Sequence, residues 1–130
     1  MNRQAILETL HKALPDVIAV YAFGSRIEGT AHAESDLDLA VLVAGYADPV
    51  SLWTLSGQIS EITACPVDLL DFRAASTVMQ YQILNKGARW YAKDSTASLY
   101  EAAILSEKTA LDQARAGLLD DIKKEGRIYA

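Results

Sequence analysis

Two aspartates one residue apart, Asp36 and Asp38, are the side chains of this sequence best suited to binding a hard cation. They open the run DLDLAVLV, in which Asp36, Asp38, Ala40 and Leu42 alternate with aliphatic residues, as on one face of a strand. Their Cα atoms would lie about 6.6 Å apart, close enough to share one or two cations. Two bare charges about 4 Å apart repel by about 4 kcal/mol at an effective dielectric of about 20, so the pair calls for a cation or solvent. A solvated strand end is the ordinary interpretation of such a pair on its own.

The dipeptide Gly24-Ser25 precedes the acids by ten residues and changes that interpretation. It ends the apolar run VIAVYAF, which predicts a buried strand over 17–23, and it leads into RIEG, a possible short helix. Free backbone N–H groups at a helix N-terminus stabilise phosphate oxygens. Gly24 would let the backbone approach the phosphates and Ser25 would donate a hydrogen bond. An anion cradle beside a cation site is the arrangement that phosphoryl and nucleotidyl transfer require.

These residues resemble a known family. Gly24, Ser25, the ten-residue spacer, Asp36 and Asp38 are similar to the GS-x10-DxD signature of the DNA-polymerase-β-like nucleotidyltransferases, and GSRIEGTAHAESDLDLAVLV resembles their minimal branch. The resemblance covers about residues 1–92. It implies a third carboxylate on a later strand, which VDLLDF supplies as Asp68 or Asp71. We favour Asp68, because an acid directly after the first apolar residue of the strand resembles the family pattern.

The resemblance also implies a role for each acid, with ATP as substrate and two Mg²⁺ ions. Asp36 and Asp38 would hold the nucleotide-bound magnesium and bridge the second ion. Asp68 would ligate that second ion and accept the proton of the attacking hydroxyl.

Four residues are expected to contact the phosphates. Gly24 and Ser25 would hold the outer phosphates, and Ser35 is a further donor next to the acids. Arg26 could offset triphosphate charge, although a salt bridge to Glu28 or Glu34 fits the sequence nearly as well.

Within the minimal branch, the chain resembles the antitoxins of toxin–antitoxin pairs whose toxin is a HEPN-domain RNase. The resemblance implies transfer of AMP from ATP to a toxin tyrosine, which silences the toxin, and a hetero-oligomer with it. Two alternatives remain open. One is a small-molecule nucleotidyltransferase of the aminoglycoside type, which usually carries a further C-terminal domain. The other is a binding protein that blocks its partner without catalysis.

The elements that must position these residues follow from hydrophobic spacing. Helices are expected over 4–14, 49–64, 74–87 (with Gly87 as the stop signal) and 95–122, and strands over 17–23, 36–43, 67–72 and 89–92. Strands and helices do not alternate strictly, which favours an α+β fold with a small mixed sheet. The link between the first two strands leaves their relative direction open. We expect one domain over 1–130, with its core in 1–92 and a long C-terminal helix.

Composition limits the remaining possibilities. A net charge of −5 argues against a general nucleic-acid surface, and no apolar run is long enough for a membrane span, so a cytoplasmic protein is expected. The single cysteine, Cys65, excludes an internal disulfide and reads as a small buried hydrophobe. His11 and His32 are interpreted as surface residues. Trp53 and Tyr91 are interpreted as core or rim aromatics, either of which could line an adenine pocket.

Overall fold

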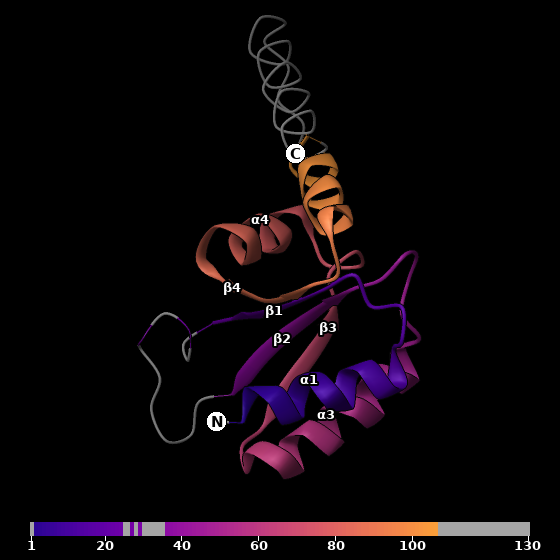
Figure 1. Cartoon of the computed structure of the whole chain (residues 1–130). Helices are drawn as coiled ribbons and strands as arrows, with labels where there is room; N and C mark the ends of the chain where they lie inside the picture. Colours follow the sequence, from indigo (N-terminus) through magenta and orange to yellow (C-terminus); the bar gives the residue numbers. More distant parts are fainter. Residues whose placement is uncertain (1, 25–26, 28, 30–35, 107–130) are drawn as a thin grey trace, which may run out of the picture.

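The fold of the chain is a four-stranded sheet between two layers of helices. The computed structural model describes residues 2–24, 27, 29 and 36–106 (Figure 1). In chain order, the elements are α1 (Arg3–Ala13), β1 (Ala19–Phe23), β2 (Leu37–Leu42), α3 (Pro49–Thr63), β3 (Val67–Asp71), α4 (Thr77–Lys86) and β4 (Ala88–Ala92). Residues 95–106 are helical and close the described part. The expected continuation of this helix to residue 122 lies outside the described residues.

The sheet has the strand order β3-β2-β1-β4 and is mixed. β1 runs antiparallel to both β2 and β4, whereas β2 and β3 are parallel. The antiparallel pairing of β1 with β2 settles a question that the sequence left open. Phe23 pairs with Asp38, and Asp38 pairs with Asp68 on its other side. The end of β1 and the starts of β2 and β3 therefore meet at one edge of the sheet.

Successive side chains along the strands point to opposite faces of the sheet and contribute to two separate hydrophobic clusters. α1 and α3 cover one face of the sheet, and α4 with the helix 95–106 covers the other (Figure 1). On β2, Leu37, Leu39 and Val41 pack toward α1 and α3, while Ala40 and Leu42 pack toward α4. This confirms the predicted α+β class, and Asp38 shares a face with Ala40 and Leu42 as the alternation predicts.

The C-terminal end of α4 is fixed against β1 by a close backbone approach. α4 ends at Lys86, and the N–H of Gly87 donates to Ile83 O at 2.9 Å. A Cβ atom on Gly87 would come within 2.5 Å of Ile83 O and 3.0 Å of Ala22 O. The expected stop at Gly87 is confirmed, although its φ of −82° means that close packing explains the glycine and a left-handed turn does not.

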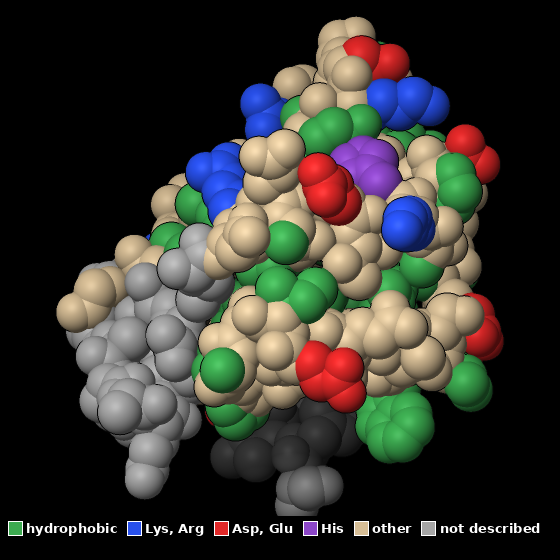
Figure 2. Space-filling model, turned by 60° about the horizontal axis from the view of Figure 1, so that its bottom comes forward, with side chains coloured by type: hydrophobic (Ala, Val, Ile, Leu, Met, Phe, Trp, Pro, Cys, Tyr) green, Lys and Arg blue, Asp and Glu red, His purple; other side chains and the backbone are tan. Residues whose placement is uncertain are grey.

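The apolar residues that recur at helical spacing in 49–64 and 95–106 predict a buried face for each helix, and both predictions are partly wrong. On α3, Leu52, Leu55 and Ile59 are buried, but Val50, Trp53 and Ile62 are 69%, 79% and 40% exposed. One stripe at i, i+3 and i+7 already fills the contact with α1 and β3, so the other apolar residues face outward. Figure 2 shows the face formed by α1 and α3, where hydrophobic side chains and charges of both signs are interspersed.

The helix 95–106 also packs through a different stripe from the one expected. Ala97 and Ile104 are buried and Tyr100 packs beside them, whereas Leu99 is 69% exposed. The helical spacing of Leu99 and Ala103 in the sequence predicts that both lie on the packing face, and this prediction is wrong because both are exposed. Among the described residues, no helix has the length and apolarity required to cross a bilayer.

Asp71 at the end of β3 has a structural role. It is 8% exposed and lies on the opposite face of the sheet from Asp68, as residues three apart on a strand should. Its carboxylate accepts hydrogen bonds from the backbone N–H of Ala47 at 2.8 Å and of Arg73 at 3.0 Å. These bonds tie the segment after β2 to the turn after β3.

Asp71→Ala is therefore expected to lower the free energy of unfolding by about 3 kcal/mol, because two backbone donors lose a charged acceptor. Asp68→Ala on the same strand is the control. Asp68 is exposed and its carboxylate makes no hydrogen bond within the described residues, so its replacement should not lower the free energy of unfolding by more than about 0.5 kcal/mol. Urea denaturation measures both values, and equal stabilities for the two variants would contradict this role of Asp71.

Candidate functional site

Three carboxylates come together at the edge of the sheet where β1 ends. Asp38 and Asp68 are direct partners in the parallel β2–β3 ladder, and Asp36 precedes β2. Asp36 and Asp68 are exposed, whereas Asp38 is half-buried. Of the two candidates for a third acid, the structure places Asp68 beside Asp38, and it places Asp71 on the other face.

The electrostatics of this cluster are those of crowded like charges. Burial raises the pKa of Asp38, and the neighbouring charges of Asp68 and then Asp36 raise it further. No ion pair within the described residues offsets these charges, since the one salt bridge there joins Arg89 to Glu101. The ionised form of the Asp38 carboxyl group is therefore disfavoured in this chain, and a nearby cation would favour it.

Gly24 is required at the end of β1 for two reasons. Its φ is +81°, a conformation that residues with a side chain rarely adopt. In addition, a Cβ atom there would lie 3.1 Å from Cγ of Asp38 and would collide with the carboxylate oxygen. The N–H of Ile27 donates to Gly24 O at 3.1 Å, so the chain turns directly after the strand. The sequence predicted close approach of this backbone to a phosphate, and the structure adds close approach to Asp38.

A cavity of about 210 Å³ opens beside these residues. Phe23, Gly24 and Asp38 form its sheet side, and Met79, Gln82 and Lys86 of α4 form the other side. Sequence reasoning missed the three α4 residues. Their i, i+3, i+7 spacing is visible in the sequence, but only the packing of α4 on β1 shows that this stripe faces the acids.

The other residues proposed from the sequence are distributed as follows. Ser25, Arg26, Ser35 and His32 lie outside the described residues. Cys65 is half-buried, and its thiol lies 3.3 Å from Thr63 Oγ1.

Neither aromatic residue suggested for an adenine pocket lines the cavity beside Asp38. Trp53 is exposed on α3, on the other side of the sheet. Tyr91 packs edge-on against His11 of α1, with ring centroids 4.4 Å apart. His11 is half-buried by that contact, so the surface assignment holds only in part. Tyr91 lies on this side because of the strand register. It pairs with Val20, whose side chain points toward α1 and α3.

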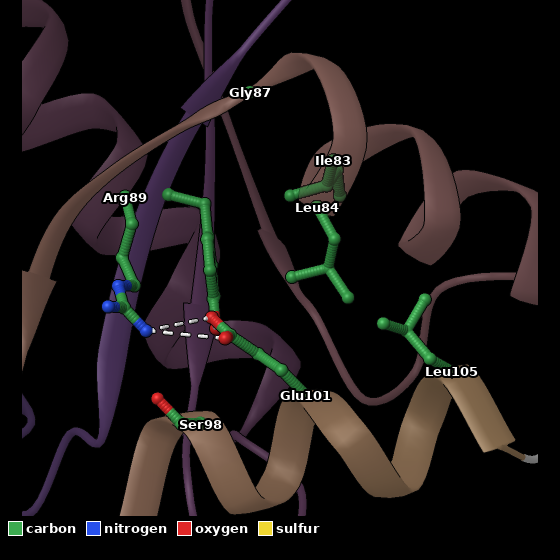
Figure 3. A pocket seen from close by; sticks show the side chains of 8 residues that line it. Ile83, Leu84, Gly87, Arg89, Ser98, Glu101 and Leu105 are labelled. Atoms are coloured by element: carbon green, nitrogen blue, oxygen red, sulfur yellow. Dashed lines mark hydrogen bonds and ion pairs between the residues drawn. The ribbon is translucent and has the colours of Figure 1, made fainter. Parts of the chain in front are cut away.

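A second cavity, of about 360 Å³, lies between α4 and the helix 95–106 (Figure 3). Three of its polar side chains bind one another. Glu101 binds Arg89 at 3.2 Å and accepts a hydrogen bond from the Tyr21 hydroxyl at 2.9 Å. Burial, followed by the nearby Glu101 charge, raises the pKa of Tyr21, so this hydroxyl stays protonated. These contacts attach the last helix to the sheet.

The donor set at the sheet edge fits a hard divalent cation. Its groups are carboxylate oxygens with excess negative charge, the ligands that Mg²⁺ takes in proteins. The fit is one of charge and donor type alone, because among the described residues no group of three or more His, Cys, Asp and Glu side chains is placed to hold a metal ion. The side chains of Asp36 and Asp68 are exposed and have room to rotate toward an ion.

Asp38→Asn should stabilise the metal-free chain at neutral pH, because it removes a charge that the folded state disfavours. The raised pKa fixes the sign of the pH dependence. Below about pH 3.9, the unfolded-state pKa, the carboxyl is protonated in both states and the advantage of the variant disappears. The advantage should develop as the pH rises from there through the raised pKa, and then remain constant. Thermal unfolding from pH 3 to 8 in EDTA tests this, and a variant less stable than wild type at pH 7 would contradict it.

Comparison with known proteins gives a consistent result. The sequence matches the family described as "Polymerase beta, Nucleotidyltransferase" over residues 4–96. It is 31% identical over 122 residues to a protein adenylyltransferase, MntA, of Shewanella oneidensis, covering 94% of this chain and 88% of that protein.

Two solved structures extend the similarity to the fold. A chain of a toxin–antitoxin crystal structure with AMP-PNP superposes with a TM-score of 0.82 at 31% identity, covering 95% of this chain and 99% of that one. A chain of the complex between tri-AMPylated Shewanella oneidensis HEPN toxin and its MNT antitoxin gives 0.74 at 28% identity, covering 94% and 96%. With its acids, its Gly24 turn and its sheet order in place, this chain belongs to the polymerase beta nucleotidyltransferase family.

Proposed function

We propose that this protein is a magnesium-dependent adenylyltransferase antitoxin, which transfers AMP from ATP to a tyrosine hydroxyl of a HEPN-domain RNase toxin. The observation that carries the proposal is the register Phe23–Asp38–Asp68, which sets Asp68 beside Asp38 and sets Asp38 beside Gly24 in the lining of one cavity. A cation site directly beside a backbone turn that can approach phosphate is the minimum that nucleotidyl transfer needs.

The relatives supply the acceptor class. The similar Shewanella oneidensis protein is named a protein adenylyltransferase, and similar chains occur in complexes with AMP-PNP and with a tri-AMPylated HEPN toxin. The similarity spans nearly the whole of this chain and of each of those chains. This favours an acceptor protein of the same class and a hetero-oligomer with it.

The reaction at this site follows from the charges. Magnesium, when bound, neutralises the phosphates and polarises the acceptor hydroxyl. Asp36 and Asp38 would hold the nucleotide-bound ion, and Asp68 would complete the second ion site. Asp68, exposed at the edge of the sheet, would accept the proton of the attacking hydroxyl. The hydroxyl oxygen forms a bond to the α-phosphorus, the α–β phosphoanhydride bond breaks, and pyrophosphate leaves.

The phosphate contacts are part of the same proposal. The Gly24 turn would present its backbone to the outer phosphates, with Ser25 and Ser35 as hydroxyl donors and Arg26 as a countercharge. The φ of Gly24 and the hydrogen bond from Ile27 support a chain reversal at this point.

Asp36→Asn and Asp38→Asn should each reduce AMP transfer by about 10³-fold or more, since each removes a ligand charge where the phosphates must be neutralised. The assay incubates the partner toxin with ATP, Mg²⁺ and the chain, and mass spectrometry should show additions of about 329 Da on tyrosine. Asp16→Asn is the matched control, because Asp16 is an exposed aspartate just before the opposite end of β1. A toxin that stays unmodified yet is neutralised by Asp38→Asn would favour a steric binder. AMP transfer to an aminoglycoside instead would favour a small-molecule enzyme.

Replacing the two acids of β3 should separate chemistry from stability. Asp68→Asn is expected to lose about 10²-fold or more of transfer with unchanged unfolding, because the residue faces the site. Asp71→Asn should lose stability and keep most of its transfer below its melting temperature, because its carboxylate caps backbone N–H groups on the other face. Transfer rates and melting curves on the same samples test this, and the reverse pattern would assign the third acid to Asp71.

A further inference from the structure

Lys86 has a position that the family signature does not include. It is the last residue of α4, and the close contact of Gly87 with Ala22 O holds it near the end of β1. It lines the cavity of about 210 Å³ together with Gly24 and Asp38. The sheet side of this cavity therefore includes the Asp38 carboxylate, and its α4 side includes the Lys86 side chain.

No acidic side chain in the described part of the chain forms an ion pair with Lys86. Arg89, two residues beyond Gly87, is neutralised by Glu101 at 3.2 Å, and Arg73 lies over the Tyr100 ring and donates to Val43 O at 3.3 Å. The side chain of Lys86 makes no ion pair and no hydrogen bond with the described residues, and Lys86 is exposed where it lines the cavity. A solvated ammonium beside the Gly24 turn is available to an anionic ligand.

The kind of ligand follows from the negative charge that cations bound to the carboxylates would leave on the nucleotide. Cations held by Asp36, Asp38 and Asp68 would offset part of the charge on the phosphate oxygens, but the two outer phosphates, which leave as pyrophosphate, carry further negative charge. Lysine offers this charge a mobile point cation with three donors. No other cationic side chain in the described residues lines this cavity.

We propose that Lys86 binds the outer phosphates of ATP and the pyrophosphate that leaves, from the α4 side of the cavity. This inference rests on the proposed function only in taking ATP as the nucleotide. Lys86 is then a substrate-binding residue that distinguishes nucleoside triphosphates from monophosphates. The competing role is structural, since a lysine in the last turn of a helix also interacts favourably with the helix dipole.

The test is calorimetric binding of AMP-PNP, inorganic pyrophosphate and AMP, each with Mg²⁺ and without any acceptor protein. Lys86→Ala should weaken the binding of AMP-PNP and of pyrophosphate by about 10-fold or more, as expected for loss of a hydrogen bond to a charged group. The same variant should bind AMP with an affinity within about twofold of wild type, because AMP lacks the outer phosphates. Lys86→Arg, which keeps the charge, should recover most of the affinity.

Lys93→Ala is the matched control. Lys93 is an exposed lysine that follows β4 at the far end of the sheet, since Ala92 pairs with Ala19 and Ala88 pairs with Ala22. The Lys93→Ala variant should bind all three ligands with wild-type affinity. Melting curves on the same samples separate binding from the helix-dipole role, which predicts a less stable Lys86→Ala variant with wild-type affinity.

The outcomes separate this inference from the proposed function. Wild-type affinity of Lys86→Ala for AMP-PNP, or equal weakening of AMP and AMP-PNP, would overturn the role of Lys86 even if AMP transfer to the toxin is observed. Selective weakening by Lys86→Ala would support it even if the toxin proves to be the wrong acceptor. A wild-type chain that does not bind AMP-PNP would overturn both.

Discussion

The register of β1, β2 and β3 is the constraint on which the site depends. Because Phe23 pairs with Asp38 and Asp38 pairs with Asp68, the Gly24 turn and the acids are held at one edge of the sheet. A slip of one residue in β2 would turn Asp38 into the cluster of Leu37, Leu39 and Val41, and would expose those side chains. The two hydrophobic layers that fix this register are thus also what positions the carboxylates.

This arrangement places like charges together at a cost that the rest of the fold tolerates. Asp38 is half-buried next to Asp68 and Asp36, which raises its pKa, and its carboxylate fills the space that a side chain at position 24 would need. Partial burial keeps the surroundings of the acids less polar than water, so that a cation bound there interacts strongly with them. Asp71, on the other face, accepts two backbone hydrogen bonds and secures the loops on either side of the strand pair. The same short strand therefore supplies one acid for the site and one for stability.

Residue patterns predicted the parts of this architecture that local rules determine. Alternation in DLDLAVLV placed Asp38 on the correct face, Gly87 ended α4, and the choice of Asp68 over Asp71 as the neighbour of Asp38 agrees with the β2–β3 register. Local rules could not predict the relative direction of the strands or the face that each helix buries, because both depend on how the elements pack together. Trp53 and Leu99 illustrate this, since each fits a helical apolar pattern and each is exposed. The α4 wall of the cavity was missed for the same reason, and Lys86 with it.

The most direct test of the central claim is a count of divalent ions at the carboxylate edge. Mn²⁺ reports on oxygen-ligand sites of the Mg²⁺ type, so electron paramagnetic resonance can follow its titration into the chain in the presence of AMP-PNP. We expect two bound ions per chain for the wild-type protein and fewer than two for Asp38→Asn. Mn²⁺ binding that equals that of AMP-PNP alone, or that is unchanged by Asp38→Asn, would contradict it.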